Sequence, residues 1–484
     1  MTVPVASEDM TWLLMDRPNN LMYVHGVLYL AEPPDWDAVY QVLQERVIDK
    51  FPVFSRRAVE IDGDWHWQDD PDFDLQFHMR RVELPSPGSE LQAEQYISGR
   101  FSEPFDFDHP LWQMDLIEGL EDGRAMVMAR FHHGIADGVR LVQLLLSLLD
   151  PMGEDAAPVP KSVGRKGGKP SPATVVSGAA KTVVSGATDF VSGVGSAIQK
   201  APGAITRIGP QAITQGWIHL REPSRITDAV SRIASDDNVL VNSWRSVSRL
   251  TLSGRSVDTV WSGTPGVEKK VAWVTGLDLA EIRDIGKKHM VTINDVMLSA
   301  VSLGVTEYLA RKGEDSVDQV AWLIPVSLKP IDAELPEDLG NHFAVVMLSM
   351  PLGIRDPHKL LRETHTRMNR IKNSVEPMLL YGVQRVVAET PAPVSVRLTN
   401  LVANKTVGII TNVPGPRAPM ALAGTEVTGI LGWVPTSGDQ PLGVCIFSYN
   451  GVVNIGIAAD AGLVPDPDLL AELIEDAVGQ LAAG

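Results

Sequence analysis

A long stretch of altered composition divides this chain of 484 residues and limits how it can fold. From Lys161 to Arg207, glycine, serine, alanine and valine dominate, and seven basic residues stand against one acidic residue. A chain of this length is also too long for one ordinary hydrophobic core. We therefore predict two folded domains, at 1–155 and 244–484, joined by a basic, partly helical linker at 156–243.

Two interpretations of the linker stay open. Val184, Ala187, Val191, Val194 and Ile198 recur at steps of three and four residues, which would place them on one side of a helix. The abundant glycine lowers intrinsic helicity and favours a flexible connection instead. The basic amphipathic alternative is a segment that settles on anionic lipid or on a lipid-droplet surface.

Both flanking parts show mixed α/β patterns. In the first part we expect helices at 36–50 and 91–101, a strand and acidic loop at 65–77, a strand at 125–131 and a helix at 139–149. In the second part we expect strands at 271–274, 322–328 and 343–350, and helices at 279–289, 292–311, 356–371 and 466–481. Asn450-Gly451 predicts a hairpin turn within 444–459. The fold class is therefore α/β (α+β).

Composition excludes several classes of protein. A net charge of -18 argues against a nucleic-acid partner, which needs a basic face. The single cysteine, Cys445, forbids an internal disulfide, fits a reducing compartment and is expected to be a small core residue. No zinc-type spacing, signal peptide or bilayer-spanning apolar run is found, so any membrane contact is expected to be peripheral.

One short motif carries a chemical signal. His132-His133-Gly134-Ile135-Ala136-Asp137-Gly138 has the form H-H-x-x-x-D-G and lies between the predicted strand at 125–131 and the predicted helix at 139–149. Histidine titrates near neutral pH and so suits general-base work. Adjacent residues of a strand point to opposite faces, so only one of the two histidines should face a given cavity. Asp137 has the alternative role of capping the next helix.

Other segments accompany the motif. Ser7 to Leu14 followed by Met22 to Gly26, Pro110-Leu111-Trp112, Asn294 to Ser299, Pro325 to Leu328, Leu339-Gly340-Asn341 and Asn412 to Pro416 lie along nearly the whole chain. Together with H-H-x-x-x-D-G, they resemble the bacterial wax ester synthase/diacylglycerol acyltransferase family. Ser299 departs from that family's usual alanine.

The resemblance implies a fold and a reaction. The fold would be two domains like chloramphenicol acetyltransferase or a peptide condensation domain, with the active site in a tunnel between them. The reaction would move a long-chain acyl group from acyl-CoA to diacylglycerol or a fatty alcohol. His133 would be the general base, and His132 would orient the loop or bond across the domain. No metal or redox cofactor is expected, with acyl-CoA acting as co-substrate.

Further candidates concern the developing oxyanion and the substrates. The backbone near Gly138 and the side chain of Asn294 are candidate hydrogen-bond donors. Asn294 and Asp295 start a predicted helix, where Asp295 has an alternative role in a cap with Thr292. Asn412 and the following Pro-Gly-Pro are expected to end an apolar strand and either shape the tunnel or simply terminate the strand.

Two other functions stay open at this stage. One is an acyltransferase of the same fold that acts on a different alcohol or amine. The other is a lipid-droplet binding protein without catalysis, although such a protein has no need of the intact histidine motif. For the leading function we expect a cytoplasmic protein, peripherally associated with the inner membrane surface or with lipid inclusions.

Overall fold

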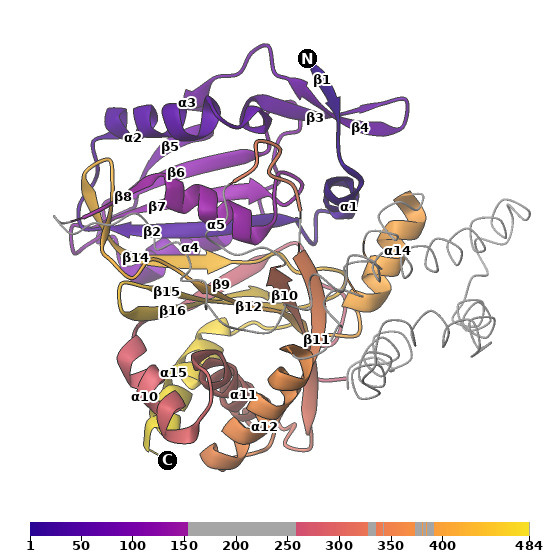
Figure 1. The fold of residues 1–484 in the computed structure, drawn as a ribbon, viewed down its shortest axis with the longest axis vertical. Helices are drawn as coiled ribbons and strands as arrows, with labels where there is room; N and C mark the ends of the chain where they lie inside the picture. The colour runs from indigo at the N-terminus through magenta and orange to yellow at the C-terminus, as the bar shows by residue number, and fades with distance from the viewer. Residues whose placement is uncertain are drawn as a thin grey trace, which may run out of the picture.

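The computed structural model describes residues 1–152, 258–327, 335–341, 343–372, 380, 384 and 392–483. The predicted linker at 156–243, with its lipid-binding alternative, lies outside these residues. The described part has two large sheets with helices packed against them (Figure 1). None of its helices combines the length and the apolar character that crossing a bilayer requires.

The first large sheet has seven strands and is mostly antiparallel, with a parallel β5–β6 pair at one edge. In order of pairing, its strands are β5 (Met79–Glu83), β6 (Trp112–Glu118), β7 (Ala125–His132), β2 (Tyr23–Leu30), β14 (Thr425–Trp433), β13 (Met420–Leu422) and β8 (Leu149–Pro151). A small second sheet pairs β1 (Thr2–Pro4), β4 (Asp64–Asp69) and β3 (Arg56–Ile61). The helices of this region are α1 (Ser7–Met15), α2 (Trp36–Leu43), α3 (Leu75–His78), α4 (Glu90–Phe101) and α5 (Gly138–Ser147).

Strand β7, which leads to the histidine motif, is buried on both faces. Val127 and Ala129 belong to the core formed with α2 and α5, whereas Met126 and Met128 belong to the core formed with α4. Side chains alternate between the faces of a strand, so both faces must be apolar here. This explains why the sequence before the motif is apolar without alternation.

The second large sheet has six strands and a helical layer. In order of pairing, its strands are β11 (Phe343–Pro351), β10 (Gln319–Ser327), β12 (Gly408–Pro414), β15 (Leu442–Tyr449), β16 (Val452–Asp460) and β9 (Lys269–Asp278). The helices α10 (Leu279–His289), α11 (Ile293–Arg311), α12 (Pro357–Lys372) and α15 (Pro467–Ala483) lie together on one side of this sheet (Figure 1). Helix α14 (Ala392–Ala403) contacts α1 of the first region.

The second half of the chain contributes two strands to the first sheet. β13 and β14 come from the second half of the chain but pair within the first sheet, β14 beside β2 and β13 beside β8. The alternating apolar positions of β14 are shared between cores, since Ile430 packs in one and Leu431 in the other. The division into 1–155 and 244–484 stays a prediction, and chain position alone does not anticipate that β13 and β14 join the first sheet.

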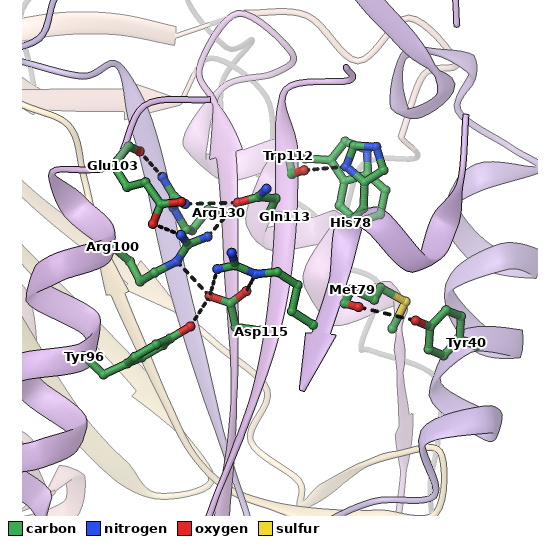
Figure 2. A network of polar contacts seen from close by, with 11 residues as sticks. Tyr40, His78, Met79, Tyr96, Arg100, Glu103, Trp112, Gln113, Asp115 and Arg130 are labelled. Carbon is green, nitrogen blue, oxygen red and sulfur yellow. Dashed lines mark hydrogen bonds and ion pairs between the residues drawn. The ribbon is translucent and has the colours of Figure 1, made fainter. Parts of the chain in front are cut away.

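A polar network holds α4 against the first sheet (Figure 2). The fully buried Asp115 carboxylate accepts hydrogen bonds from Arg80 Nε at 2.9 Å, Arg100 Nε at 2.9 Å and Tyr96 Oη at 2.8 Å. Buried charges are tolerated when they are paired and fully hydrogen-bonded. The network therefore secures the strand next to β7 without exposing a charge to the apolar core.

Local signals predicted several elements well. Ser89 and Gln92 form a capping box at α4, and Thr292 and Asp295 form the expected one at α11. The hairpin turn at Asn450-Gly451 joins β15 and β16 with positive φ at both residues. The helix expected at 36–50 is an α-helix only to Leu43 and continues as a π-helix over Gln44–Ile48.

The strand expected to end at Asn412 and the following Pro-Gly-Pro ends within that segment. β12 continues to Pro414, and Asn412 pairs in register with Ile446 of β15. The parallel neighbour β15 pairs with β12 as far as Pro414. This pairing keeps Asn412 and Pro414 in the strand, although asparagine and proline have a low preference for strands. Asn412 is therefore carried on a strand and its side chain is exposed.

Candidate active site

The histidine motif forms the predicted strand–turn–helix. His132 is the last residue of β7, and Gly138 is the first residue of α5. Asp137 is the N-cap, and its side chain accepts a 3.0 Å hydrogen bond from the Arg140 backbone N–H. Its carboxylate also lies 3.5 Å from Arg140 Nε. Asp137 therefore has the capping role that its position indicated.

The two histidines occupy different surroundings. His132 is fully buried, and its Nδ1 accepts a 2.9 Å hydrogen bond from the Gly134 backbone N–H, so the neutral ring carries its proton on Nε2. That Nε2 lies 3.8 Å from Asp16 Oδ2. Burial lowers the pKa of His132 to about 3, with a smaller contribution from His133. These contacts fit a residue that shapes the loop.

His133 lies in an aromatic setting. Its ring stacks on Trp12 of α1, with centroids 3.8 Å apart and planes 20° from parallel, and Phe343 of β11 lies 5.8 Å away. Burial lowers its pKa to about 4, while Asp137, the ring's own backbone carbonyl and the Asn341 side chain oppose the shift. The imidazole is therefore neutral at physiological pH and able to accept a proton.

The backbone of the motif is held by two other segments, one at Met22 and one at 339–341. The His133 N–H donates to Met22 O at 2.7 Å, and its carbonyl accepts from Asn341 Nδ2 at 2.9 Å. The same Nδ2 donates to Asp9 Oδ1 of α1 at 2.8 Å. The Asp137 N–H donates to Gly340 O at 3.1 Å. The segment 339–341 thus joins α1 to the motif.

Sequence reasoning assigned no role to these partners. Asp9 and Trp12 lie in the opening segment, and Asn341 lies in Leu339-Gly340-Asn341. Both segments contributed to the family resemblance, but neither has a spacing that points to His133. The contacts of these residues form only in the folded chain, so no local spacing reveals them. Only their place in a family pattern can draw attention to them.

The structure brings together two of the second-half candidates. Asn412 Nδ2 donates to Asn294 Oδ1 at 3.0 Å, which links β12 to the start of α11. Among the described residues, no hydrogen bond joins either side chain to His133. Their placement near the substrates stays a prediction.

Asp295 has structural contacts. Its Oδ2 accepts from the Thr292 backbone N–H at 2.9 Å, from Thr292 Oγ1 at 2.8 Å and from His365 Nδ1 at 2.7 Å. The residue is buried, with 1% of its surface exposed. Asp295 thereby fastens α11 to α12, and its predicted contact with substrate stays untested.

Two further positions bear on the chemistry. A Cβ built on Gly138 would meet no heavy atom within 4 Å, so open space adjoins the first turn of α5. Cys445 is buried in β15, and burial raises the pKa of its thiol to about 11. Such a thiol is protonated and inert at neutral pH, as expected for a core residue. Within the described ranges, no cluster of His, Cys, Asp or Glu has the grouping of a metal site.

Comparison with known families decides the identity of the fold. The model of the wax ester synthase/diacylglycerol acyltransferase catalytic domain matches residues 5–297, and that of the corresponding C-terminal domain matches residues 339–482. The chain belongs to the wax ester synthase/diacylglycerol acyltransferase family. It is accordingly an acyltransferase, and the resemblance drawn from its motifs is confirmed.

Individual relatives of this acyltransferase cover nearly its whole length. It is 26% identical over 467 residues to a probable diacylglycerol O-acyltransferase of Mycobacterium tuberculosis, covering 95% of this chain and 91% of the relative. It is 24% identical over 488 residues to the O-acyltransferase WSD of Acinetobacter baylyi, covering 98% and 96%.

Solved structures confirm the fold class. A wax ester synthase/diacylglycerol acyltransferase from Marinobacter aquaeolei superposes with a TM-score of 0.65 at 18% identity, covering 99% of this chain and 98% of that one. The first condensation domain of the calcium-dependent antibiotic synthetase gives a TM-score of 0.56 at 12% identity, covering 100% and 96%. The predicted α/β fold of the condensation-domain kind is therefore correct.

Proposed function

We propose that this acyltransferase moves a long-chain acyl group from acyl-CoA to diacylglycerol or to a long-chain fatty alcohol, giving triacylglycerol or wax ester, with His133 as general base. The observation that carries the proposal is a buried, neutral imidazole at the end of β7, within the region matched by the family's catalytic domain. Relatives named as diacylglycerol O-acyltransferases support the acceptor class.

The proposed chemistry needs one proton-accepting atom. His133 Nε2 takes the hydroxyl proton as the alcohol oxygen attacks the thioester carbonyl carbon. The C–O bond forms, the C–S bond breaks, and the CoA thiolate recovers the proton from the imidazolium. The tetrahedral oxyanion needs donors, for which the Gly138 backbone N–H and the Asn294 amide remain the candidates. No covalent enzyme intermediate is required, which agrees with the buried and protonated Cys445.

The substrates imply a lipid environment. Diacylglycerol and long-chain alcohols partition into membranes or droplets, so the proposal includes peripheral contact of a cytoplasmic enzyme with the inner membrane surface or with lipid inclusions. The acyl-CoA donor is a co-substrate, and no cofactor is part of the proposal.

Ester formation by a matched set of variants tests the function. Palmitoyl-CoA is incubated with diacylglycerol and, separately, with hexadecanol, and both CoA release and ester are followed. His133→Ala should lose roughly 100-fold to 10000-fold in rate, the usual contribution of a general base. His66→Ala removes a histidine of the small sheet, whose Nδ1 contacts its neighbour Asp64 O, and should retain full activity.

The outcomes separate the alternatives. Ester made by wild type and lost in His133→Ala supports the proposal, and the acceptor ratio shows whether triacylglycerol or wax ester is favoured. Full activity in His133→Ala would refute the assignment of the base. A folded wild type that makes no ester with either acceptor would favour the alternatives, a different alcohol or amine acceptor or a lipid binder without catalysis.

A further inference from the structure

One amide side chain from the second half of the protein reaches the histidine motif in the first half. Asn341 is 5% exposed, and its Nδ2 donates to two acceptors, the His133 backbone carbonyl and the Asp9 carboxylate. The backbone carbonyl of His133 can only accept, so the assignment of nitrogen and oxygen in this amide is fixed by chemistry. The amide oxygen must therefore point elsewhere.

Two buried atoms, one of this amide and one of the His133 ring, lack a hydrogen-bond partner. Asn341 Oδ1 and His133 Nδ1 are both inaccessible to solvent, and neither has a hydrogen bond of good geometry within the described residues. One of them is an acceptor, and the other is a donor when it carries the ring proton. A buried polar group without a hydrogen bond is unfavourable, so an adjustment that pairs these two atoms is favourable.

The electrostatics of the ring agree with this pairing. After the opposing effects of burial and of the Asp137 charge, the ring's own backbone carbonyl and then the Asn341 side chain raise the pKa of His133, which is the effect of acceptors facing the protonated ring. Because Nδ2 is already committed to two acceptors, the atom responsible is Oδ1.

We propose that Asn341 is a positioning residue for His133: its N–H groups hold the His133 carbonyl and Asp9, and its oxygen accepts the Nδ1 proton of the imidazole. This arrangement leaves the Nε2 lone pair facing the acceptor alcohol. The inference rests on the proposed role of His133 as general base. It makes the second half of the chain a contributor to the alignment of a base carried by the first half.

The surrounding turn is built to deliver this side chain. Leu339 is fully buried in the core of the first region, and both Leu339 and Gly340 have positive φ, at 47° and 72°. A leucine with positive φ is strained and persists only where packing over-determines it. Gly340 also forms a parallel bridge with Ala136 of the motif. The turn is therefore anchored by the two residues that directly precede Asn341.

The test compares Asn341→Ala with Asn454→Ala. Asn454 is a matched control, since it is 3% exposed, donates to Ile430 O at 3.0 Å and accepts from the Gly276 N–H at 3.0 Å, away from the motif. Asn341→Ala should lower kcat by roughly 10-fold to 100-fold with little change in KM, because misplacement of a reacting group acts on the chemical step. Asn454→Ala should lower thermal stability but leave kcat and KM near wild type.

A spectroscopic readout that needs no turnover accompanies the kinetics. With ¹⁵N-labelled histidine, the His133 signals are identified by their loss in His133→Ala. Wild type should show a protonated Nδ1 and a bare Nε2, and Asn341→Ala should shift the ring toward the other tautomer. Asn454→Ala should leave the His133 signals unchanged.

A second variant guards against misfolding of the first. Asn341→Asp keeps an oxygen for Nδ1 but donates only when its carboxyl is protonated, so its deficit in kcat should be larger at pH 8 than at pH 6. A deficit that does not depend on pH would contradict the proposal, as would wild-type kcat in Asn341→Ala or a protonated Nε2 in the wild-type His133. If His133→Ala were active, the function proposed above would fail, while the tautomer measurement would still decide the role of Asn341.

Discussion

At the scale of single residues, the neutrality of His133 comes from its burial rather than from a partner. His133 is 7% exposed and its ring lies against Trp12 and near Phe343, so its charged form is poorly solvated. The Asp137 carboxylate would stabilise the charged ring, but it is engaged at the cap of α5. A neutral imidazole with a lowered pKa can accept the proton of the alcohol and readily transfers it to the leaving thiolate.

The lowered pKa of His133 predicts an unusual pH profile. A general base works when it is unprotonated, and burial lowers this pKa to about 4, so kcat/KM should stay flat from pH 7 down to pH 5.5. A histidine with the ordinary pKa of about 6.5 would lose roughly 10-fold over the same range. Initial rates at a fixed, low concentration of acyl-CoA measure this directly.

The control for that profile concerns Asp9. Burial raises the pKa of Asp9 to about 7, so its titration falls inside the measured range. Asp9→Asn cannot titrate, and a fall in rate near neutral pH that disappears in this variant belongs to Asp9. A 10-fold fall by pH 5.5 in both proteins would contradict the buried, neutral base.

How much of the site could be predicted depends on how local each signal is. The cap at Asp137 and the loop contact of His132 involve neighbours within three residues, and a motif contains them. Asn341 lies 208 residues from His133, so its contact is set by folding and no spacing records it. The same holds for Trp12, which reaches His133 only because α1 packs against the motif in the folded chain.

At the scale of elements, close packing between α11 and α15 depends on a missing side chain. A Cβ at Gly304 of α11 would lie 2.5 Å from Ile474 Cγ1 and 3.0 Å from the Ile474 backbone nitrogen of α15. Real carbon atoms do not approach so closely, so the helices would have to separate. The close packing of α11 and α15 therefore requires glycine at position 304, despite its low helix propensity.

Alanine at two helical glycines should have opposite effects. Gly304→Ala should lower the thermal midpoint, because overpacking costs about 1–3 kcal/mol and outweighs the helix gain of roughly 1 kcal/mol. Gly99→Ala in α4, where a Cβ meets nothing within 4 Å, should raise it slightly. Calorimetry of both variants checks this, and an equal rise in both would show that the helices α11 and α15 accommodate a methyl group freely.

Element boundaries were predictable where caps and turns determine them. The boxes at α4 and α11 and the hairpin at Asn450-Gly451 are local chemistry that acts before any tertiary contact. The extension of β12 through Asn412 depends instead on a neighbouring strand. The π-helix after Leu43 likewise has no cap or glycine that marks it in the sequence.

At the scale of the whole molecule, β14 makes the two halves one folding unit. It pairs with β2 from Val427↔Leu30 to Trp433↔His25, and it contacts β15 and β16 of the second sheet. Sequence patterns showed two α/β halves, but pairing between distant strands leaves no periodic trace. The place of β13 and β14 in the first sheet could therefore be known only from the structure.

A cavity in β14 should destabilise both halves. Ile430 is 1% exposed, so Ile430→Ala should cost about 2–5 kcal/mol. Hydrogen exchange should then quicken by similar factors in β7 and in β16, which lie in different sheets. Leu91→Ala, at a side chain that is 57% exposed, serves as the control and should change neither. Faster exchange in β7 alone would mean that the halves unfold independently.

The pairing of β2 with β14 also has a consequence for synthesis on the ribosome. β7 covers one edge of β2 early, but the other edge waits until the ribosome has passed Trp433. An apolar, unpaired strand edge invites association with other chains. The nascent first half therefore spends most of translation with one edge of β2 unpaired. We expect it to need a chaperone until β14 has been synthesised and pairs with that edge.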